Sequence, residues 1–266
     1  MARTFSEDSF TFHGEINGSG VGARIFRVIH KTTGIQYALK CPREGFSLAL
    51  EAAIYSYVSH PNIVKMEGLV CSPKKTSILM ELCDEDLHTK SEREKVDVLK
   101  CIREMTDVLD YLDSRDIVYG DVKLENILIL GDVFKLADFG QSCFRSRPIY
   151  KAHGTRGYRA PEVSLCNNVS LKSDLWSLGV LTFVLITNYL PFDELCYRKK
   201  HSIDSEEIGT GKVKEVYDMI ELKLRIDKFL KDPVEKDFIS RLIVVNPNKR
   251  MTIAEIKNHP FLSKNP

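Results

Sequence analysis

The stretch IVYGDVKLENILI at residues 117–129 decides the expected fold, because it sets four polar side chains between two apolar runs of strand type. The polar residues are Asp121, Lys123, Glu125 and Asn126. A loop that buried strands fix at both ends holds its side chains in defined positions. A second stretch, FKLADFG at 134–140, places Asp138 directly after a strand and a glycine two residues later. The pair of stretches therefore predicts two functional loops, each attached to a strand.

These two loops carry groups suited to phosphate chemistry. Asn126 and Asp138 supply hard oxygen ligands, which Mg²⁺ prefers in proteins. Asp121 can accept a proton from a hydroxyl group, and Lys123 can balance the charge of a phosphate. Either stretch alone could be an ordinary turn. Their joint presence, in this order after a glycine-rich loop and a lysine, argues against a chance arrangement.

The glycine-rich segment GSGVGARI at 18–25 lies between two expected strands. Glycines let the backbone approach a phosphate and direct its N–H groups at the oxygens. An ordinary glycine-rich hairpin explains the segment equally well. A Walker loop is excluded because no G-K-[ST] follows, and a dinucleotide fingerprint is excluded because a strand rather than a helix follows.

Lys40 ends the apolar run YALK at 37–40. It is either an edge lysine that reaches water or a cation that faces phosphate. Glu51 is its natural partner in the second case. This carboxylate lies within an expected helix among apolar neighbours, where an unpaired charge would be costly.

Strand patterns precede helical patterns along the chain. Strands are expected at 10–16, 23–31, 35–40, 63–72 and 76–83. One helix at 46–59 has Leu48, Ala52, Tyr55 and Val58 on one side. An amphipathic helix at 91–116 follows, then helices at 172–187, 213–229, 234–242 and 252–257, with an exposed loop at 198–212. The fold class is therefore α+β, a small β-rich lobe with one main helix before a larger, mostly helical lobe.

Composition limits the remaining functions. The 266 residues include 38 basic and 37 acidic side chains, so no charge excess points to nucleic acid. The seven cysteines form no C-x-x-C pair, which favours reduced thiols in a cytoplasmic or nuclear protein over a disulfide framework or zinc site. The first 15 residues contain no apolar signal-peptide region, and the apolar stretch 175–187 is too short to span a bilayer. We therefore expect a soluble intracellular protein without membrane or direct nucleic-acid partners.

From about residue 12 to residue 262 the sequence resembles a eukaryotic-type serine/threonine protein kinase. The resemblance rests on a set of motifs at fixed places: the loop Gly18-x-Gly20-x-x-Ala23-x-Ile25, Ala38-Leu39-Lys40, Glu51, Asp121-x-Lys123-x-x-Asn126, Asp138-Phe139-Gly140, Ala160-Pro161-Glu162, Asp174 with Trp176, Arg250 and His259-Pro260-Phe261. It implies a bilobal kinase fold at 12–264, with an N-lobe at about 12–82, a hinge at about 81–86, a C-lobe at about 87–264 and an N-terminal extension at 1–11. The short flanks are similar to those of compact kinases of large DNA viruses such as baculoviruses, and we expect no regulatory domain.

The resemblance also implies roles for the reacting groups. Lys40 would hold the α- and β-phosphates of ATP and pair with Glu51. Asp121 would orient the substrate hydroxyl and accept its proton, and Lys123 would neutralise the γ-phosphate. Asn126 and Asp138 would bind Mg²⁺, or Mn²⁺ in its place. The substrates would be serine and threonine hydroxyls of proteins, since Lys123 and Thr155 match the serine/threonine type.

Further residues follow for the nucleotide and for the frame around it. Glu81, Leu82 and Cys83 would form the hinge behind Met80 as gatekeeper, with Asp86 or Glu85 near the ribose. The expected nucleotide-binding residues are Gly18, Ser19, Gly20, Val21, Gly22, Ala23, Ile25, Ala38, Lys40, Met80, Glu81, Cys83, Asp86, Asn126, Leu128 and Asp138. Glu162 would form a buried pair with Arg250, and Asp174 would cap the backbone of the catalytic loop.

Three departures from the family pattern matter. Ala23 replaces the third loop glycine and adds only one methyl group. Tyr119-Gly120 stands where His-Arg is usual, and Lys151 lies where the family often places a phosphorylated residue. The arginine that commonly binds that phosphate is therefore missing, which predicts activity without phosphorylation of the activation segment.

Substrate preference and activity leave alternatives open. Glu125, together with Asp84, Glu85 and Asp86, could select basic substrate segments, or these residues could form a solvated acidic turn. A pseudokinase scaffold and a small-molecule phosphotransferase of related fold are the rivals to a protein kinase. Lys40, Asp121 and Asp138 are all present, against the scaffold, and the Ala160-Pro161-Glu162 segment favours a peptide substrate.

Overall fold

The computed structural model describes residues 3–16, 22–146, 154–192 and 219–263. Contacts within the chain divide it into two compact units. The first unit comprises Met1–Glu94 and Leu124–Ser142, and the second comprises Lys95–Lys123 and Cys143–Pro266. The first unit takes in residues 124–142, because residues 128 and 129 pair with residues 85 and 86. The lobe boundary expected at about 81–86 stays a prediction.

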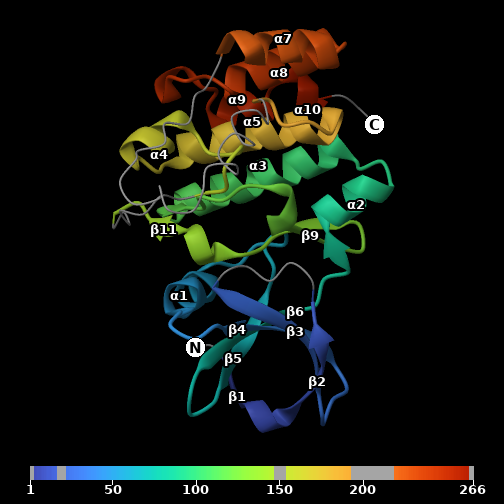
Figure 1. The fold of residues 1–266 in the computed structure, drawn as a ribbon, viewed down its shortest axis with the longest axis vertical. Helices are drawn as coiled ribbons and strands as arrows, with labels where there is room; N and C mark the ends of the chain where they lie inside the picture. The colour runs from blue at the N-terminus through green and yellow to red at the C-terminus, as the bar shows by residue number, and fades with distance from the viewer. Residues whose placement is uncertain (1–2, 17–21, 147–153, 193–218, 264–266) are drawn as a thin grey trace, which may run out of the picture. The chain divides into compact units, whose positions relative to one another are not determined.

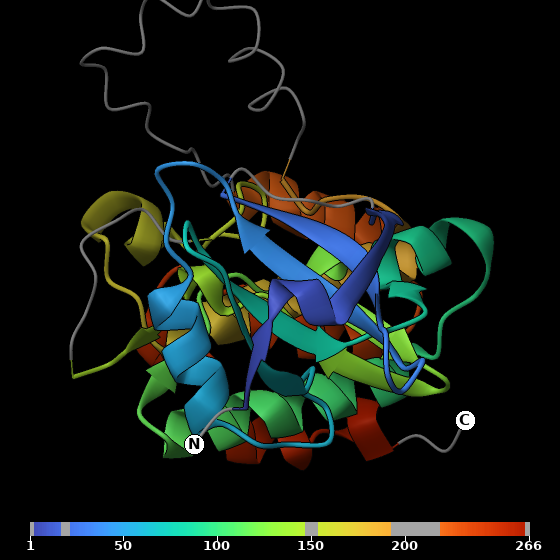
Figure 2. The ribbon, with the colours of Figure 1, turned by 90° about the horizontal axis from the view of Figure 1, so that it is seen from below.

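A six-stranded sheet in the order β1-β5-β6-β4-β3-β2 dominates the first unit. The strands are β1 (Thr4–Ser6), β2 (Phe10–Glu15), β3 (Ala23–His30), β4 (Gln36–Pro42), β5 (Met66–Cys71) and β6 (Thr76–Glu81), with a 3₁₀ turn η1 at Glu7–Ser9. The sheet is curled, and helix α1 (Ala49–Tyr57) lies against it (Figure 1, Figure 2). The buried side chains of Val28, Leu39, Val70 and Leu79 form its core. These strands follow the expected runs to within a few residues.

The N-terminal residues, expected to be an extension, add an edge strand to this sheet. β1 pairs in parallel with β5, while the other neighbours in the sheet are antiparallel. The Leu69 N–H donates to the Arg3 carbonyl at 2.8 Å. A Cβ at Gly68 would lie 2.5 Å from that same carbonyl, so only glycine permits this approach.

A second, smaller sheet in the first unit has the order β10-β9-β7. Its strands are β7 (Glu85–Asp86), β9 (Ile127–Leu130) and β10 (Val133–Leu136), and α2 (Leu87–Arg93) follows β7. β9 and β10 form a hairpin in which Leu136 lies opposite Ile127. The 3₁₀ turns η2 (Leu124–Asn126) and η3 (Phe139–Gln141) flank this hairpin, one just before β9 and one just after β10.

The second unit is mostly helical and is built on α3 (Val98–Ser114) and α5 (Leu171–Thr187). The helix expected at 172–187 is present as α5, and every residue from Ser173 to Phe183 is buried. The remaining elements are β8 (Ile117–Val118), β11 (Cys143–Phe144), α4 (Pro161–Cys166), α7 (Met219–Phe229), α8 (Pro233–Leu242), η5 (Pro247–Lys249), α9 (Ile253–Lys257) and α10 (Pro260–Ser263). With its β-rich first unit and its helical second unit, the chain has the expected α+β class.

Two expected helices differ from the observed ones. The helix expected at 91–116 begins only at Val98, because Asp97 caps it by accepting a hydrogen bond from the Lys100 N–H at 2.9 Å. The helix expected at 46–59 is the shorter α1. Of its predicted apolar side, Tyr55 is buried, and Leu48, Ala52 and Val58 are half-buried. The buried residues of α1 are Glu51, Ile54 and Tyr55. Glu51 can be buried because its carboxylate accepts a hydrogen bond from Lys40.

Several expectations concern segments that the structure describes only in part. The exposed loop expected at 198–212 lies outside the described residues, and the helix expected at 213–229 is described from Met219 onward. In the described ranges, every helix is too short or too polar to cross a membrane. The six cysteines in these ranges all carry free thiols.

Candidate phosphoryl-transfer site

Lys40 is the centre of a buried ionic cluster in the first unit. It lies near the end of β4, where its side chain is 8 % exposed. Its Nζ donates to Glu51 Oε1 at 2.7 Å and to Asp138 Oδ1 at 2.9 Å. A sheet strand, a helix and the loop after β10 thus each supply one charged group. Glu51 points inward and forms the ion pair with Lys40 that its place among apolar residues predicts.

The charges of this cluster hold one another in place. Burial opposes the positive charge of Lys40, but the carboxylates of Asp138 and Glu51 outweigh it and raise the pKa of the lysine. Burial raises the pKa of Glu51, and Lys40 partly offsets that effect. Lys40 therefore keeps its proton at neutral pH and remains a fixed cation that faces a half-exposed carboxylate.

The β9–β10 hairpin brings the two expected metal ligands to one end of the small sheet. The strand ladder is extended by a hydrogen bond of 2.8 Å from the Ala137 N–H to the Asn126 carbonyl. Asn126 therefore lies opposite Ala137, the residue that precedes Asp138. Asn126 is buried, whereas the Asp138 side chain is 45 % exposed. An amide oxygen and a carboxylate fit Mg²⁺, which is commonly bound by few protein oxygens and retains several waters.

The residues expected around the nucleotide are only partly described. Gly18, Ser19, Gly20 and Val21 lie outside the described residues. Gly22 accepts a backbone hydrogen bond from Arg43 at 2.9 Å. The other sheet residues of this set follow in register: Ala23 lies opposite Pro42, Ile25 opposite Lys40, and Ala38 opposite Met80.

The side chains of the expected hinge make structural contacts. Glu81 accepts from the Lys65 N–H and pairs with Lys135, both at 2.8 Å. Burial, with the charge of Glu81, raises the pKa of the Cys83 thiol to about 12. Asp86 lies opposite Leu128 and caps α2 by accepting from the Thr89 N–H at 2.9 Å. That capping use of Asp86 was not foreseen, although an aspartate before a helix is its ordinary signal.

Three side chains of the second unit, those of Asp121, Lys123 and Thr155, contact one another. The Thr155 hydroxyl donates to Asp121 Oδ1 at 2.7 Å and accepts from Lys123 Nζ at 2.9 Å. Lys123 Nζ also lies 3.3 Å from Asp121 Oδ2. Asp121 is buried and Lys123 is partly exposed. A carboxylate, a cation and an alcohol are thus in direct contact.

Asp174, at the start of α5, fixes the backbone of this loop. Its Oδ2 accepts from the Tyr119 N–H at 2.9 Å, and its Oδ1 accepts from the Gly120 N–H at 2.8 Å. Complete burial raises the pKa of Asp174 to about 7, although both backbone bonds act in the opposite direction. Gly120 has φ 85°, a left-handed conformation that favours glycine over the arginine usual in the family.

A bidentate ion pair lies deeper in the second unit. Arg250 donates to both carboxylate oxygens of Glu162, at 2.6 and 2.7 Å. The Arg250 side chain is fully buried and also donates to the carbonyls of Lys172 and Val244, both at 2.7 Å. The buried pair implied by the resemblance is therefore present.

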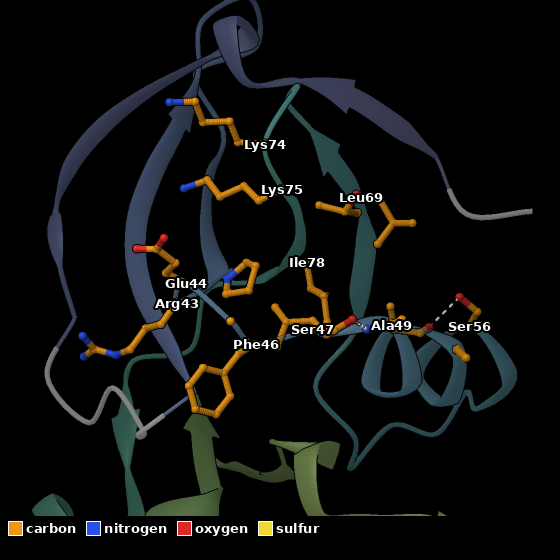
Figure 3. A pocket seen from close by; sticks show the side chains of 16 residues that line it. Arg43, Glu44, Phe46, Ser47, Ala49, Ser56, Leu69, Lys74, Lys75 and Ile78 are labelled. Atoms are coloured by element: carbon orange, nitrogen blue, oxygen red, sulfur yellow. Dashed lines mark hydrogen bonds between the residues drawn. The ribbon is translucent and has the colours of Figure 1, made fainter.

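The first unit also has a surface hollow of about 980 Å³ beside α1. Ala49, Ala52 and Ser56 line one wall of it, and the side chains of Lys74 and Lys75 project beside it (Figure 3). None of Lys40, Glu51 and Asp138 belongs to its lining. α1 therefore lines this hollow with one face and contacts the Lys40 cluster with another.

One residue in contact with the Lys40 cluster is not among the expected site residues. Tyr55 was expected only as an apolar residue of its helix, yet its hydroxyl accepts from the Asp138 N–H at 3.1 Å. Its position four residues after Glu51 is the signal that could have found it, because residues spaced by four share a helix face.

Comparisons with known proteins agree with this geometry. A family model described as a protein kinase domain matches residues 11–262. An Aurora kinase of Eremothecium gossypii is 30 % identical over 271 residues, which cover 95 % of this chain and 69 % of that protein. Serine/threonine-protein kinase 33 of Mus musculus is 29 % identical over 290 residues, which cover 97 % of this chain and 56 % of that protein. The chain thus spans between half and about two thirds of these relatives.

A solved structure supports the fold separately. The crystal structure of a kinase domain superposes with a TM-score of 0.76 at 22 % identity and covers 96 % of both chains. The expected similarity to viral kinases stays a prediction. The family model matches nearly the whole chain, and one of these relatives is named a serine/threonine-protein kinase, so this chain belongs to the protein kinase family and is a kinase of the serine/threonine type.

Proposed function

We propose that the chain transfers the γ-phosphate of ATP to serine and threonine hydroxyls of protein substrates, with Asp121 as the group that orients the hydroxyl. One observation carries this proposal: Asp121 Oδ1 accepts from the Thr155 hydroxyl at 2.7 Å, with Lys123 in contact with both. A substrate hydroxyl needs the same acceptor. Its oxygen would form a bond to phosphorus as the bond to ADP breaks, and its proton would pass to Asp121.

The first unit supplies the groups for the nucleotide. In this proposal Lys40 binds the α- and β-phosphates, and Glu51 keeps the lysine directed toward them. Asn126 and Asp138 would hold the metal ion, which neutralises phosphate charge when it is bound. The other residues proposed to contact the nucleotide are Gly22, Ala23, Ile25, Ala38, Met80, Glu81 and Cys83.

We also propose that activity does not need a phosphorylated activation segment. Gly120 offers no cation to a phosphate, and its left-handed backbone is anchored to Asp174 instead. The start of the segment is already held by the protein itself. β11 pairs with β8, and Arg145 forms ion pairs with Asp113 and Asp116.

A preference for basic substrate segments belongs to the same proposal, and it rests on Glu125. This carboxylate is exposed in η2, between Lys123 and Asn126. The three other acidic residues of the region have local partners. Asp84 accepts from the Gly131 N–H at 2.8 Å, Glu85 pairs with Arg93, and Asp86 caps α2.

Labelled ATP, Mg²⁺ and matched peptides with and without arginines test this function. The wild-type chain should label serine or threonine peptides, and the arginine-rich peptide should react faster. Asp121→Asn should lower the rate by about 10²- to 10⁴-fold, the usual contribution of one general base. It should still bind ATP, because Asp121 is not among the residues proposed to hold the nucleotide.

Asp110→Asn is the matched control, since Asp110 is an exposed aspartate of α3 that pairs with Lys257. It should leave the rate unchanged. A wild-type chain that binds ATP but labels no peptide would be a scaffold, and the proposal would fall. Equal rates on the two peptides would remove the preference for basic segments alone.

A further inference from the structure

Tyr55 connects α1 to Asp138 through a hydrogen bond and a ring contact. Its hydroxyl accepts from the Asp138 N–H at 3.1 Å. Its ring meets the ring of Phe139 edge-on, with the centroids 4.8 Å apart and an interplanar angle of 74°. The side chain is only 4 % exposed. One tyrosine therefore touches both the backbone of the expected metal ligand and the residue after it.

The backbone at Asp138 needs such support. Its φ of 55° and ψ of 81° lie in the left-handed region, which is unfavourable for a residue with a Cβ. The ladder between β9 and β10 ends with the Ala137 N–H, which donates to the Asn126 carbonyl. The next N–H along the chain is that of Asp138, and Tyr55 receives it. The hydroxyl therefore extends the row of hydrogen bonds into the strained turn.

The hydroxyl group is not required for packing. Phenylalanine would make the same ring contact with Phe139, and a buried hydroxyl is costly unless it forms hydrogen bonds. Burial and the nearby charges of Glu51 and Asp138 raise the pKa of Tyr55 well above its usual value, so the group stays neutral. The hydrogen bond to Asp138 is thus a specific reason for tyrosine at this position.

The same helix face also carries Glu51, one turn before Tyr55. Glu51 holds Lys40, and Lys40 in turn contacts Asp138 Oδ1. Asp138 Oδ1 also accepts from the Gly140 N–H at 3.0 Å. α1 therefore acts on Asp138 at two points, at its carboxylate through Lys40 and at its backbone through Tyr55.

We propose that Tyr55 is a positioning residue, whose hydroxyl fixes the left-handed backbone of Asp138 and thereby the direction in which its carboxylate meets the metal ion of the nucleotide. This inference rests on the proposed function, because it assumes that Asp138 binds the metal. It assigns no contact between Tyr55 and substrate. The proposal predicts that Mg²⁺ increases the affinity for ADP by less when only the Tyr55 hydroxyl is removed.

Tyr55→Phe removes the hydroxyl and keeps the ring. Amide hydrogen exchange, measured on the whole chain by NMR, should show a protected Asp138 amide in the wild type and exchange about 3- to 10-fold faster in the variant, as expected for one neutral hydrogen bond. Calorimetry of ADP binding gives the second measurement. Added Mg²⁺ should increase ADP affinity in the wild type, and that increase should shrink by about 3- to 10-fold in the variant. Affinity without Mg²⁺ should stay within about twofold.

Tyr57→Phe is the matched control, because it removes a hydroxyl from the exposed side of the same helix. It should behave as wild type in both measurements. The inference is overturned if Tyr55→Phe keeps the full effect of Mg²⁺, even if Asp138 exchanges faster, since the bond would then be merely structural. A rapidly exchanging Asp138 amide in the wild type overturns it without any variant. A wild-type chain whose ADP affinity ignores Mg²⁺ would instead refute the proposed function itself.

Discussion

Asp174 is the residue whose environment has the clearest consequence for stability. Its carboxyl group is buried, and it holds the two backbone N–H groups that precede Asp121. Burial raises its pKa from 3.8 to about 7. The folded chain therefore keeps this proton over a pH range in which the unfolded chain has lost it.

This pKa predicts a pH dependence of the free energy of unfolding. The contribution of the protonated Asp174 is complete below about pH 4 and is lost as the pH rises to about 7, because only the unfolded carboxyl ionises freely in that window. Asp174→Asn, which is neutral throughout, should have a smaller loss of stability between pH 4.5 and pH 7.5 than wild type. Urea unfolding at both pH values measures this difference. Equal pH slopes for the two chains would show that Asp174 does not titrate in this range.

Residue types allowed some of these contacts to be predicted from the sequence. Glu51 was identified because a charge among apolar helix residues needs a partner, and Lys40 provides it. Tyr55 was missed because a tyrosine fits an apolar face without its hydroxyl being considered. The Asp138 N–H donates to the Tyr55 hydroxyl, and the direction of this N–H depends on the left-handed turn at Asp138. No local sequence pattern specifies that turn.

Pairs of elements far apart in the sequence stabilise the second unit. Glu162 belongs to α4, and Arg250 follows η5, 88 residues later. Arg250 also lies over the Trp176 ring of α5, with its guanidinium carbon 5.0 Å from the ring centroid. One buried arginine therefore links α4, α5 and the segment before α9.

Removing one partner of this pair should be strongly destabilising. Arg250→Met would leave the Glu162 carboxylate without its charge partner and should lower the free energy of unfolding by about 3–5 kcal/mol. Arg241→Met is a matched control, because Arg241 is 45 % exposed and its bond to Glu255 is a surface pair expected to contribute about 0–1 kcal/mol. Urea unfolding of Arg250→Met, Glu162→Gln and the double variant completes the test. Additive losses would mean that the two side chains do not stabilise each other.

Element boundaries followed the sequence where one apolar period dominated. The strands β2 to β6 and the buried helix α5 lie where expected. Helix α3 starts later than expected, because the capping bond of Asp97 decides its first turn and the apolar period alone does not show it. The predicted apolar side of α1 did not include the buried Glu51, because hydrophobic periodicity cannot place a charged residue inside. Its inward direction depends on Lys40 from another strand.

For the whole molecule, the motif set predicted the family and the fold class, and local chemistry alone would not have done so. Each motif by itself allowed an ordinary turn, whereas their order along the chain matched one family over residues 11–262. The departures within that order matter most for regulation. Gly120 replaces the arginine that the family commonly uses for a phosphate, and this replacement is why we propose activity without a phosphorylated activation segment.

The final prediction is therefore that phosphatase treatment leaves activity unchanged. Contacts at the described parts of the segment form without a phosphate. At its start β11 pairs with β8 and Arg145 lies between Asp113 and Asp116, and nearer its end Thr155 bonds to Asp121. Chain produced in bacteria should label peptides at the same rate before phosphatase treatment and after it, with mass spectrometry to confirm that the treated chain carries no phosphate. Arg145→Gln should reduce that rate, because it removes both ion pairs, while Arg115→Gln serves as the control. A loss of activity with phosphatase would show that a phosphorylated residue supplies the anchor instead.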